Sequence, residues 1–186
     1  MIQYINIPMK ILVTPDKFLR LTAKSVVVYD KKLEKQISEM IKTLKSAKDP
    51  EGVGLAATQV GINRRLFIVT LSGKPEVFIN PTITNQSKAM LSEVHPKKKD
   101  RWLEGCLSLP GIWGFVDRPY SIEIEYQTPH EGKLVPRHRK FEDAESAYVL
   151  HENDHLDGIL FTDHILKQGG QIFRETKDGL VPIGQI

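Results

Sequence analysis

Two histidines one helical turn apart are the residues whose spacing most directly suggests chemistry. His151 and His155 stand at positions i and i+4 of the segment His-Glu-Asn-Asp-His, which places both imidazoles on one face of a helix. Both rings can therefore reach a single metal ion. Glu152 follows the first histidine directly, where its carboxylate can act as a general base on a metal-bound water. The segment predicts a hydrolytic metal site; the alternative is a polar helix face with two hydrogen-bonded histidines.

A catalytic site of this kind needs a third protein ligand and an open position. In the metzincin pattern a third histidine follows the second one after six residues. Here that position, six residues after His155, is Phe161. His164 lies close by, in a segment that favours a surface or capping role. Cys106 is the only thiol of the chain, and its Gly-flanked segment gives it freedom to approach a metal. Because a lone cysteine is more often a buried, inert residue, both candidates remain open.

A glycine-rich segment, residues 52–59, is the third feature with possible chemistry. Its Gly-x-Gly-x-x-Ala pattern matches the dinucleotide-binding fingerprint, which follows a strand and opens a helix. Here the segment follows a lysine-rich helix end and Asp49-Pro50 instead. Its small residues therefore favour close approach of the backbone to a ligand, and Gln59 can supply a neutral amide donor.

Two helices are predicted to position these residues. Residues 141–156 carry the histidines, with acidic residues in the first turn and Gly158 as a stop signal. Residues 30–45 form an amphipathic helix with Asp30 as its N-cap.

Strands are predicted for residues 65–71, 77–84 and 121–126, while residues 51–61 are predicted to be a loop. Pro81 places the second strand at a sheet edge, because proline cannot donate to a ladder. Helices and strands do not alternate as βαβ units. The sequence therefore predicts an α+β fold, with mostly antiparallel sheets packed around the central helix that carries the metal motif.

Composition narrows the class of protein. The 186 residues, 40% hydrophobic and 26% charged, predict a single globular domain. A net charge of +3 is too small to indicate a specific nucleic-acid partner. No apolar run approaches the ~20 residues of a membrane span, and no leader pattern is present. With one cysteine no internal disulfide can form, so we expect a cytoplasmic protein.

Three segments together resemble the peptide deformylases, in identity and in order. They are Gly52-x-Gly54-x-Ala56-Ala57-x-Gln59, Glu104-Gly105-Cys106-Leu107-Ser108 and His151-Glu152-x-Asp154-His155. The resemblance extends from about residue 11 to about residue 164. It implies a metal-dependent hydrolase that removes the formyl group from N-formyl-methionine of newly made polypeptides and releases formate.

The resemblance also implies roles for individual residues. Glu152 would be the acid and base, and Gln59 with the backbone N–H of Leu107 would hold the oxyanion. Glu104 would pair with Arg118. One divalent metal, Fe(II) in the cell with Ni(II) or Zn(II) tolerated, would bind Cys106, His151 and His155. The methionine pocket is expected at Val53, Gly54, Leu107, Ala147 and Tyr148.

The chain departs from the family in two places. Leu150 stands where family members often carry glutamine, which predicts the loss of a hydrogen bond behind the ligands. In some bacterial members a basic C-terminal helix docks at the ribosome, and no such helix is predicted here. We expect one deformylase domain over residues 1–186, with residues 1–10 as an extension and residues 167–186 as a non-helical tail.

Two other functions compete with deformylation. A catalytically inactive homologue that only binds metal or formyl peptide would lack Glu152, Gln59 or a ligand, yet all are present. A zinc endopeptidase shares the helix motif, but its third ligand is not an upstream cysteine. The partners expected are therefore N-formyl-methionyl nascent peptides, with no membrane.

Overall fold

The computed structural model describes residues 8–47, 52–97 and 101–184. Residues 1–7 of the predicted extension lie outside the described residues. The helices are η1 (Lys17–Arg20), α1 (Lys31–Ser46), η2 (Ala57–Val60), α2 (Leu91–Val94), α3 (Asp143–Leu156) and α4 (Phe161–Lys167), where η marks a 3-10 helix. The strands are β1 (Gly54–Ala56), β2 (Leu66–Leu71), β3 (Lys74–Gln86), β4 (Glu104–Cys106), β5 (Leu109–Gly114), β6 (Ser121–His130), β7 (Lys133–Glu142), β8 (Ile172–Thr176) and β9 (Gly179–Ile183).

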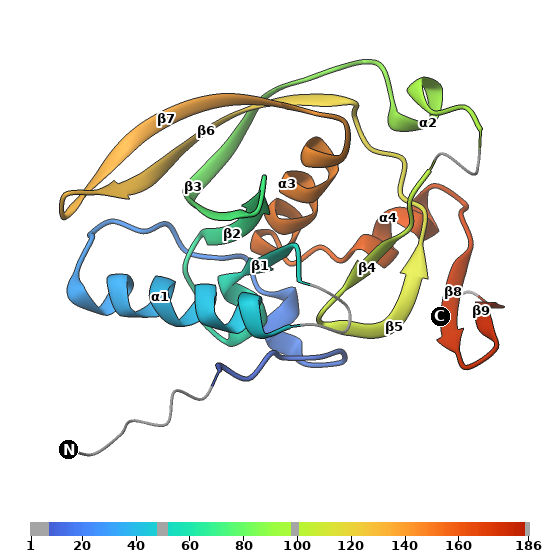
Figure 1. The fold of residues 1–186 in the computed structure, drawn as a ribbon, viewed down its shortest axis with the longest axis horizontal. Helices are drawn as coiled ribbons and strands as arrows, with labels where there is room; N and C mark the ends of the chain where they lie inside the picture. The colour runs from blue at the N-terminus through green and yellow to red at the C-terminus, as the bar shows by residue number, and fades with distance from the viewer. Residues whose placement is uncertain (1–7, 48–51, 98–100, 185–186) are drawn as a thin grey trace.

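The strands form two antiparallel sheets, and α3 lies between them (Figure 1). One sheet has the order β1-β2-β3-β6-β7 and the other has the order β4-β5-β8-β9. The helix α3 contacts β1, β2 and β7, while α4 contacts β4. The predicted α+β class with mostly antiparallel sheets is confirmed, and α3 carries both histidines.

Both faces of β2 are covered by helices. Phe67 and Val69 pack in one cluster with Val149 of α3, whereas Leu66 and Ile68 pack in the cluster that contains the apolar face of α1. Successive side chains of a strand point to opposite faces, so an almost continuous apolar run suits a strand buried on both sides. The predicted strand over residues 65–71 is confirmed, with its start one residue later.

The helix α1 confirms the predicted amphipathic helix, and it ends one residue later than predicted. The carboxylate of Asp30, the N-cap, accepts a hydrogen bond from the Leu33 N–H at 2.7 Å. Such a cap satisfies one free donor of the first turn and contributes about 1 kcal/mol to helix stability. Leu33, Met40 and Leu44 are buried, and they hold α1 against the sheet face opposite α3.

The prediction that Pro81 marks an edge strand is wrong. The strand β3 runs through residues 74–86 and lies between β2 and β6. The register to β6 shifts between Ile79 and Thr82, and Pro81 falls in this irregularity. A bulge leaves a residue outside the regular ladder, so a proline without an N–H is tolerated inside the sheet.

The prediction of a loop over residues 51–61 is also wrong for most of its length. Residues 54–56 form β1, which pairs with β2, and residues 57–60 form η2. Leu55 and Ala56 are fully buried. The small side chains that suggested an open loop instead let this short edge strand pack closely under α3.

The helix α3 begins two residues later than predicted. Phe141 and Glu142 still pair with β6 as the end of β7, because the Phe141 side chain is buried in the core. Leu150 of α3 faces the same core cluster. Beyond the C-terminus of α3, Gly158 has a φ of +70°, and a Cβ there would lie 2.5 Å from the Arg20 carbonyl oxygen. Only glycine permits this contact, which fixes the end of α3 against the chain after η1.

The chain after α4 forms a hairpin of β8 and β9, and β8 pairs with β5 of the second sheet. None of the helices in the described part of the chain has the length and apolarity needed to span a membrane.

Candidate metal centre

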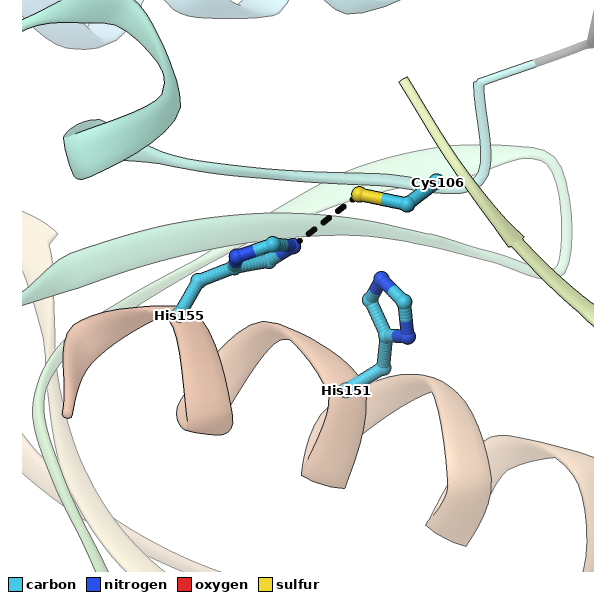
Figure 2. A group of neighbouring side chains, drawn as sticks. All are labelled: Cys106, His151 and His155. Atoms are coloured by element: carbon cyan, nitrogen blue, oxygen red, sulfur yellow. Dashed lines mark hydrogen bonds between the residues drawn. The ribbon is translucent and has the colours of Figure 1, made fainter. Parts of the chain in front are cut away.

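Cys106, His151 and His155 converge between the two sheets. Cys106 ends β4, and the two histidines rise from one face of α3 toward its sulfur (Figure 2). Their ligand atoms all lie within 4.8 Å of one another, and the Cys106 Sγ lies 3.2 Å from the His155 Nε2. A thiolate and two imidazoles form a donor set suited to Zn²⁺, Fe²⁺ or Ni²⁺. Three such donors leave the open position of a catalytic site, so the cluster fits a divalent metal ion.

His164, the other candidate for a third ligand, lies outside this cluster. Its Nε2 lies 2.9 Å from the Asp154 Oδ2 on α3. The position of the third metzincin histidine is filled by Phe161, whose ring centroid lies 5.9 Å from that of His151. The structure therefore brings the thiol, and not His164, to the two histidines.

A buried ion pair orients His151. The His151 Nδ1 lies 2.8 Å from the Glu104 Oε2, which leaves Nε2 free for a metal. Arg118 donates from Nε and Nη2 to the two oxygens of Glu104, so the predicted pairing of these residues is confirmed. Burial alone would raise the pKa of Glu104, but the Arg118 guanidinium and the His151 ring outweigh it and lower the pKa to about 2. Glu104 is therefore a carboxylate at neutral pH and an acceptor for the His151 Nδ1–H.

The same arginine reaches α3 at a second point. Arg118 Nη1 donates to the Asp154 Oδ2 at 2.9 Å, and this oxygen is also the partner of His164 on α4. Arg118 thus ties β4, α3 and α4 together behind the cluster.

Glu152 is buried against β1. It is only 4% exposed, and its Oε2 has no hydrogen-bond partner among the described residues. Burial raises the pKa of Glu152 to about 7, which suits a group that exchanges a proton near neutral pH. A Cβ on Gly54 would lie 2.3 Å from the Glu152 Oε1, so glycine is required where the β1 backbone passes this carboxylate.

Gln59 of η2 lies beside the thiol. Its Nε2 donates to the Cys106 Sγ at 3.4 Å and to the Ser108 Oγ at 3.1 Å. Its Oε1 accepts from the Ala56 N–H at 2.8 Å, which fixes the direction of the amide. The adjacent Thr58 donates from its hydroxyl to the carbonyl of His155 at 3.0 Å, so η2 supports the ligand helix as well.

A cleft opens onto the cluster between the edge strands β1 and β4. It is lined by Cys106, His151, Glu152 and Gln59 and by all five residues predicted for the substrate pocket, Val53, Gly54, Leu107, Ala147 and Tyr148. The structure therefore brings every predicted site residue except His155 to the lining, and His155 lies behind it as a buried member of the cluster.

Sequence reasoning missed three residues of this cleft, Leu103 and the aromatic residues Trp102 and Trp113. Trp102 and Trp113 are the only tryptophans of the chain, and they flank the segment that contains Cys106. Aromatic residues on both sides of a predicted ligand segment were the available signal. Ser108, the second partner of the Gln59 amide, was also missed as a contact.

The chain is similar to one family of known proteins. A family model described as polypeptide deformylase matches residues 8–170. The peptide deformylase of Synechocystis sp. is 36% identical over 163 residues, covering 85% of this chain and 79% of that protein. The peptide deformylase of Natranaerobius thermophilus is 35% identical over 168 residues, covering 89% and 95%.

Solved structures agree with this likeness. The crystal structure of the Thermotoga maritima peptide deformylase has a TM-score of 0.73 at 33% identity and covers 85% of this chain and 97% of that one. The peptide deformylase of Synechococcus elongatus, solved in complex with actinonin, has a TM-score of 0.72 at 30% identity and covers 95% and 91%.

Replacing Cys106 with alanine is expected to lower metal occupancy well below that of the parent protein, because two imidazoles remain where three donors converged. The matched control is His164→Ala, which removes a nearby histidine outside the cluster and should leave occupancy close to the parent's. Mass spectrometric metal analysis after identical loading measures both. Unchanged occupancy in Cys106→Ala would remove this thiol from the ligand set.

Proposed function

The chain belongs to the polypeptide deformylase family, and from this we propose that Glu152 is the acid and base with which it removes the formyl group from N-formyl-methionyl nascent peptides. One observation carries the assignment. The Glu152 carboxylate is buried, unpaired at Oε2, and lines the same cleft as Cys106 and His151. No other carboxylate of that lining is free of an ion pair, since Glu104 is held by Arg118.

The family is metal-dependent, and Cys106, His151 and His155 would hold one divalent ion. The chemistry that this ion supplies when bound is Lewis acidity toward water and toward a carbonyl oxygen. Glu104 would keep the His151 ring in the tautomer that offers Nε2. Thr58 and Gln59 would hold the other two ligands in place through their contacts to the His155 carbonyl and the Cys106 sulfur.

Glu152 carries a proton from water to the leaving amide nitrogen. As its carboxylate takes a proton from water, the oxygen of that water forms a bond to the formyl carbon. Glu152 then gives the proton to the amide nitrogen as the carbon–nitrogen bond breaks, releasing formate and a free N-terminus. Burial supports both steps, because a pKa of about 7 lets one group act as base and then as acid at neutral pH.

Gln59 and the Leu107 N–H would stabilise the negative oxygen that develops on the formyl group. The Gln59 Oε1 accepts from the Ala56 N–H, which directs the Nε2 donor toward Cys106 and Ser108 and so places an amide donor beside the cluster. A prepositioned donor of this kind contributes about 3–4 kcal/mol to lowering the barrier.

The two edge strands would bind the peptide. β1 and β4 each end a sheet, and residues 52–54 and 103–107 line opposite sides of the cleft. Edge strands offer free backbone donors and acceptors to an extended peptide. The methionine side chain would enter between Val53, Ala147 and Tyr148.

Cytoplasmic action on nascent chains is part of the proposal, supported by the single cysteine and by the substrate class of the family. Contact with the ribosome through a basic C-terminal helix is not part of it, since residues 172–183 hold a β-hairpin. The competing assignment, a zinc endopeptidase, loses its support because the polypeptide deformylase model matches residues 8–170, which include the helix motif.

Fe(II) is proposed as the native metal, on the strength of the family resemblance and a thiolate–imidazole donor set. The affinity order alone favours Zn(II) over Fe(II). The metal that occupies the site therefore depends on which ions the cell supplies. Ferrous iron and its thiolate ligand both oxidise in air. We therefore expect the iron form to lose formate-releasing activity during aerobic storage and the nickel form to keep it. An iron form that stays fully active for days in air would contradict this assignment.

Substituting Glu152 with glutamine keeps the shape of the side chain but removes the base. Formate release from formyl-Met-Ala-Ser should fall by about 10²–10⁴-fold or more, with metal content near that of the parent. The matched control is Glu145→Gln, on the same helix but partly exposed, outside the cleft lining and paired with Arg139, which should keep nearly full activity. Loss of metal in Glu152→Gln would make Glu152 a ligand or a ligand support. Nearly full activity would place the base elsewhere.

A further inference from the structure

Trp113 forms part of the cleft wall directly beside the metal ligands. It lies on β5 and pairs with Gly105 of β4. Gly105 is the residue directly before Cys106. A Cβ on Gly105 would lie 2.6 Å from the Cζ3 and 2.8 Å from the Cε3 of the indole. The ring therefore lies across the Gly105 backbone, and only a glycine there leaves room for it. The side chain is partly exposed and lines the cleft.

A second contact holds the indole from the opposite side. The Trp113 Nε1–H donates to the Glu175 Oε2 at 2.9 Å. Glu175 lies on β8, next to β5 in the second sheet (Figure 1). The family match ends at residue 170, so this partner comes from a hairpin outside the matched residues. One wall of the cleft is thus held by a contact from β8, which lies beyond the residues that the family model matches.

We propose that Trp113, held in position by Glu175, is a specificity-determining residue that contacts a side chain downstream of the formyl-methionine. The proposal rests on the deformylase function proposed above and names its peptide preference. The preferred peptides carry an aromatic side chain at the second or third residue, because a flat indole offers an extended apolar face to another ring. Glu175 is a positioning residue, since it acts only through the indole.

The two walls of the cleft separate the side chains of the peptide. Ala147 and Tyr148 on α3 face the methionine pocket, while Trp113 lies on β5, on the side of β4 away from β1. Side chains of an extended peptide alternate in direction, so a residue after methionine can reach the indole. An aromatic contact of this kind is worth about two- to tenfold in affinity beyond the area that it buries.

Peptide selectivity measures the proposed role. The parent enzyme should show a KM for formyl-Met-Phe-Ser or formyl-Met-Ala-Phe that is about two- to tenfold lower than its KM for formyl-Met-Ala-Ser. The ratio of these KM values is the selectivity ratio. Trp113→Leu, which keeps an apolar side chain to preserve folding, should bring this ratio near one. Glu175→Ala should lower the ratio partly, and Glu175→Gln should restore it because its amide oxygen still accepts the indole N–H. Asp178→Ala, on the same hairpin, is the matched control and should leave the ratio unchanged.

Calorimetric binding of the same peptides to these variants in the Glu152→Gln background separates this proposal from the proposed function. The binding ratio tests Trp113 without turnover, whereas formate release by the parent tests the function. A ratio that survives Trp113→Leu in the binding measurement would overturn the proposal. Equal loss of binding for all peptides would also overturn it, because that result indicates a purely structural role.

Discussion

The buried ion pair between Arg118 and Glu104 is the interaction on which the geometry of the site depends. The two residues are 3% and 9% exposed, and they join the strand that carries Cys106 to the helix that carries both histidines, through His151 and Asp154. No continuous stretch of chain could hold these ligands together, because Cys106 and His151 belong to segments far apart in sequence. Removing one partner of such a buried pair costs about 3–5 kcal/mol, so the same interaction aligns the ligands and stabilises the fold around them.

Close approach of backbone to side chain is the second constraint. Gly54 lets β1 pass the Glu152 carboxylate, and Gly105 lets the indole of Trp113 lie across β4. In each case the missing Cβ lets a side chain of the cleft lie against the backbone beside the cluster. Burial raises the pKa of Glu152 to about 7. The packing that brings the strands close together therefore also sets the basicity that the chemistry requires.

The sequence predicted best where one local signal determined the structure. The Asp30 cap and the apolar stripe behind it define α1, and the i, i+4 histidines lie on α3. The sequence predicted the structure less well where contacts between distant segments determine it. Pro81 is tolerated inside a sheet because a bulge forms opposite β6, and Phe141 stays in β7 because its ring enters the core. Trp113 was missed although the tryptophans on both sides of the Cys106 segment offered a signal, because the position of its ring depends on Gly105 and on the β8–β9 hairpin.

Glu104, kept charged by Arg118, accepts a hydrogen bond from the His151 Nδ1–H and leaves Nε2 free for a metal ion. Long-range ¹H–¹⁵N correlation spectra of the histidine rings in the zinc-loaded, diamagnetic protein report this directly. The account predicts a protonated Nδ1 and an unprotonated Nε2 for His151, with the Nδ1 proton in slow exchange with water. A His151 ring protonated at Nε2 would contradict it, because the metal would then have to bind the nitrogen that faces Glu104.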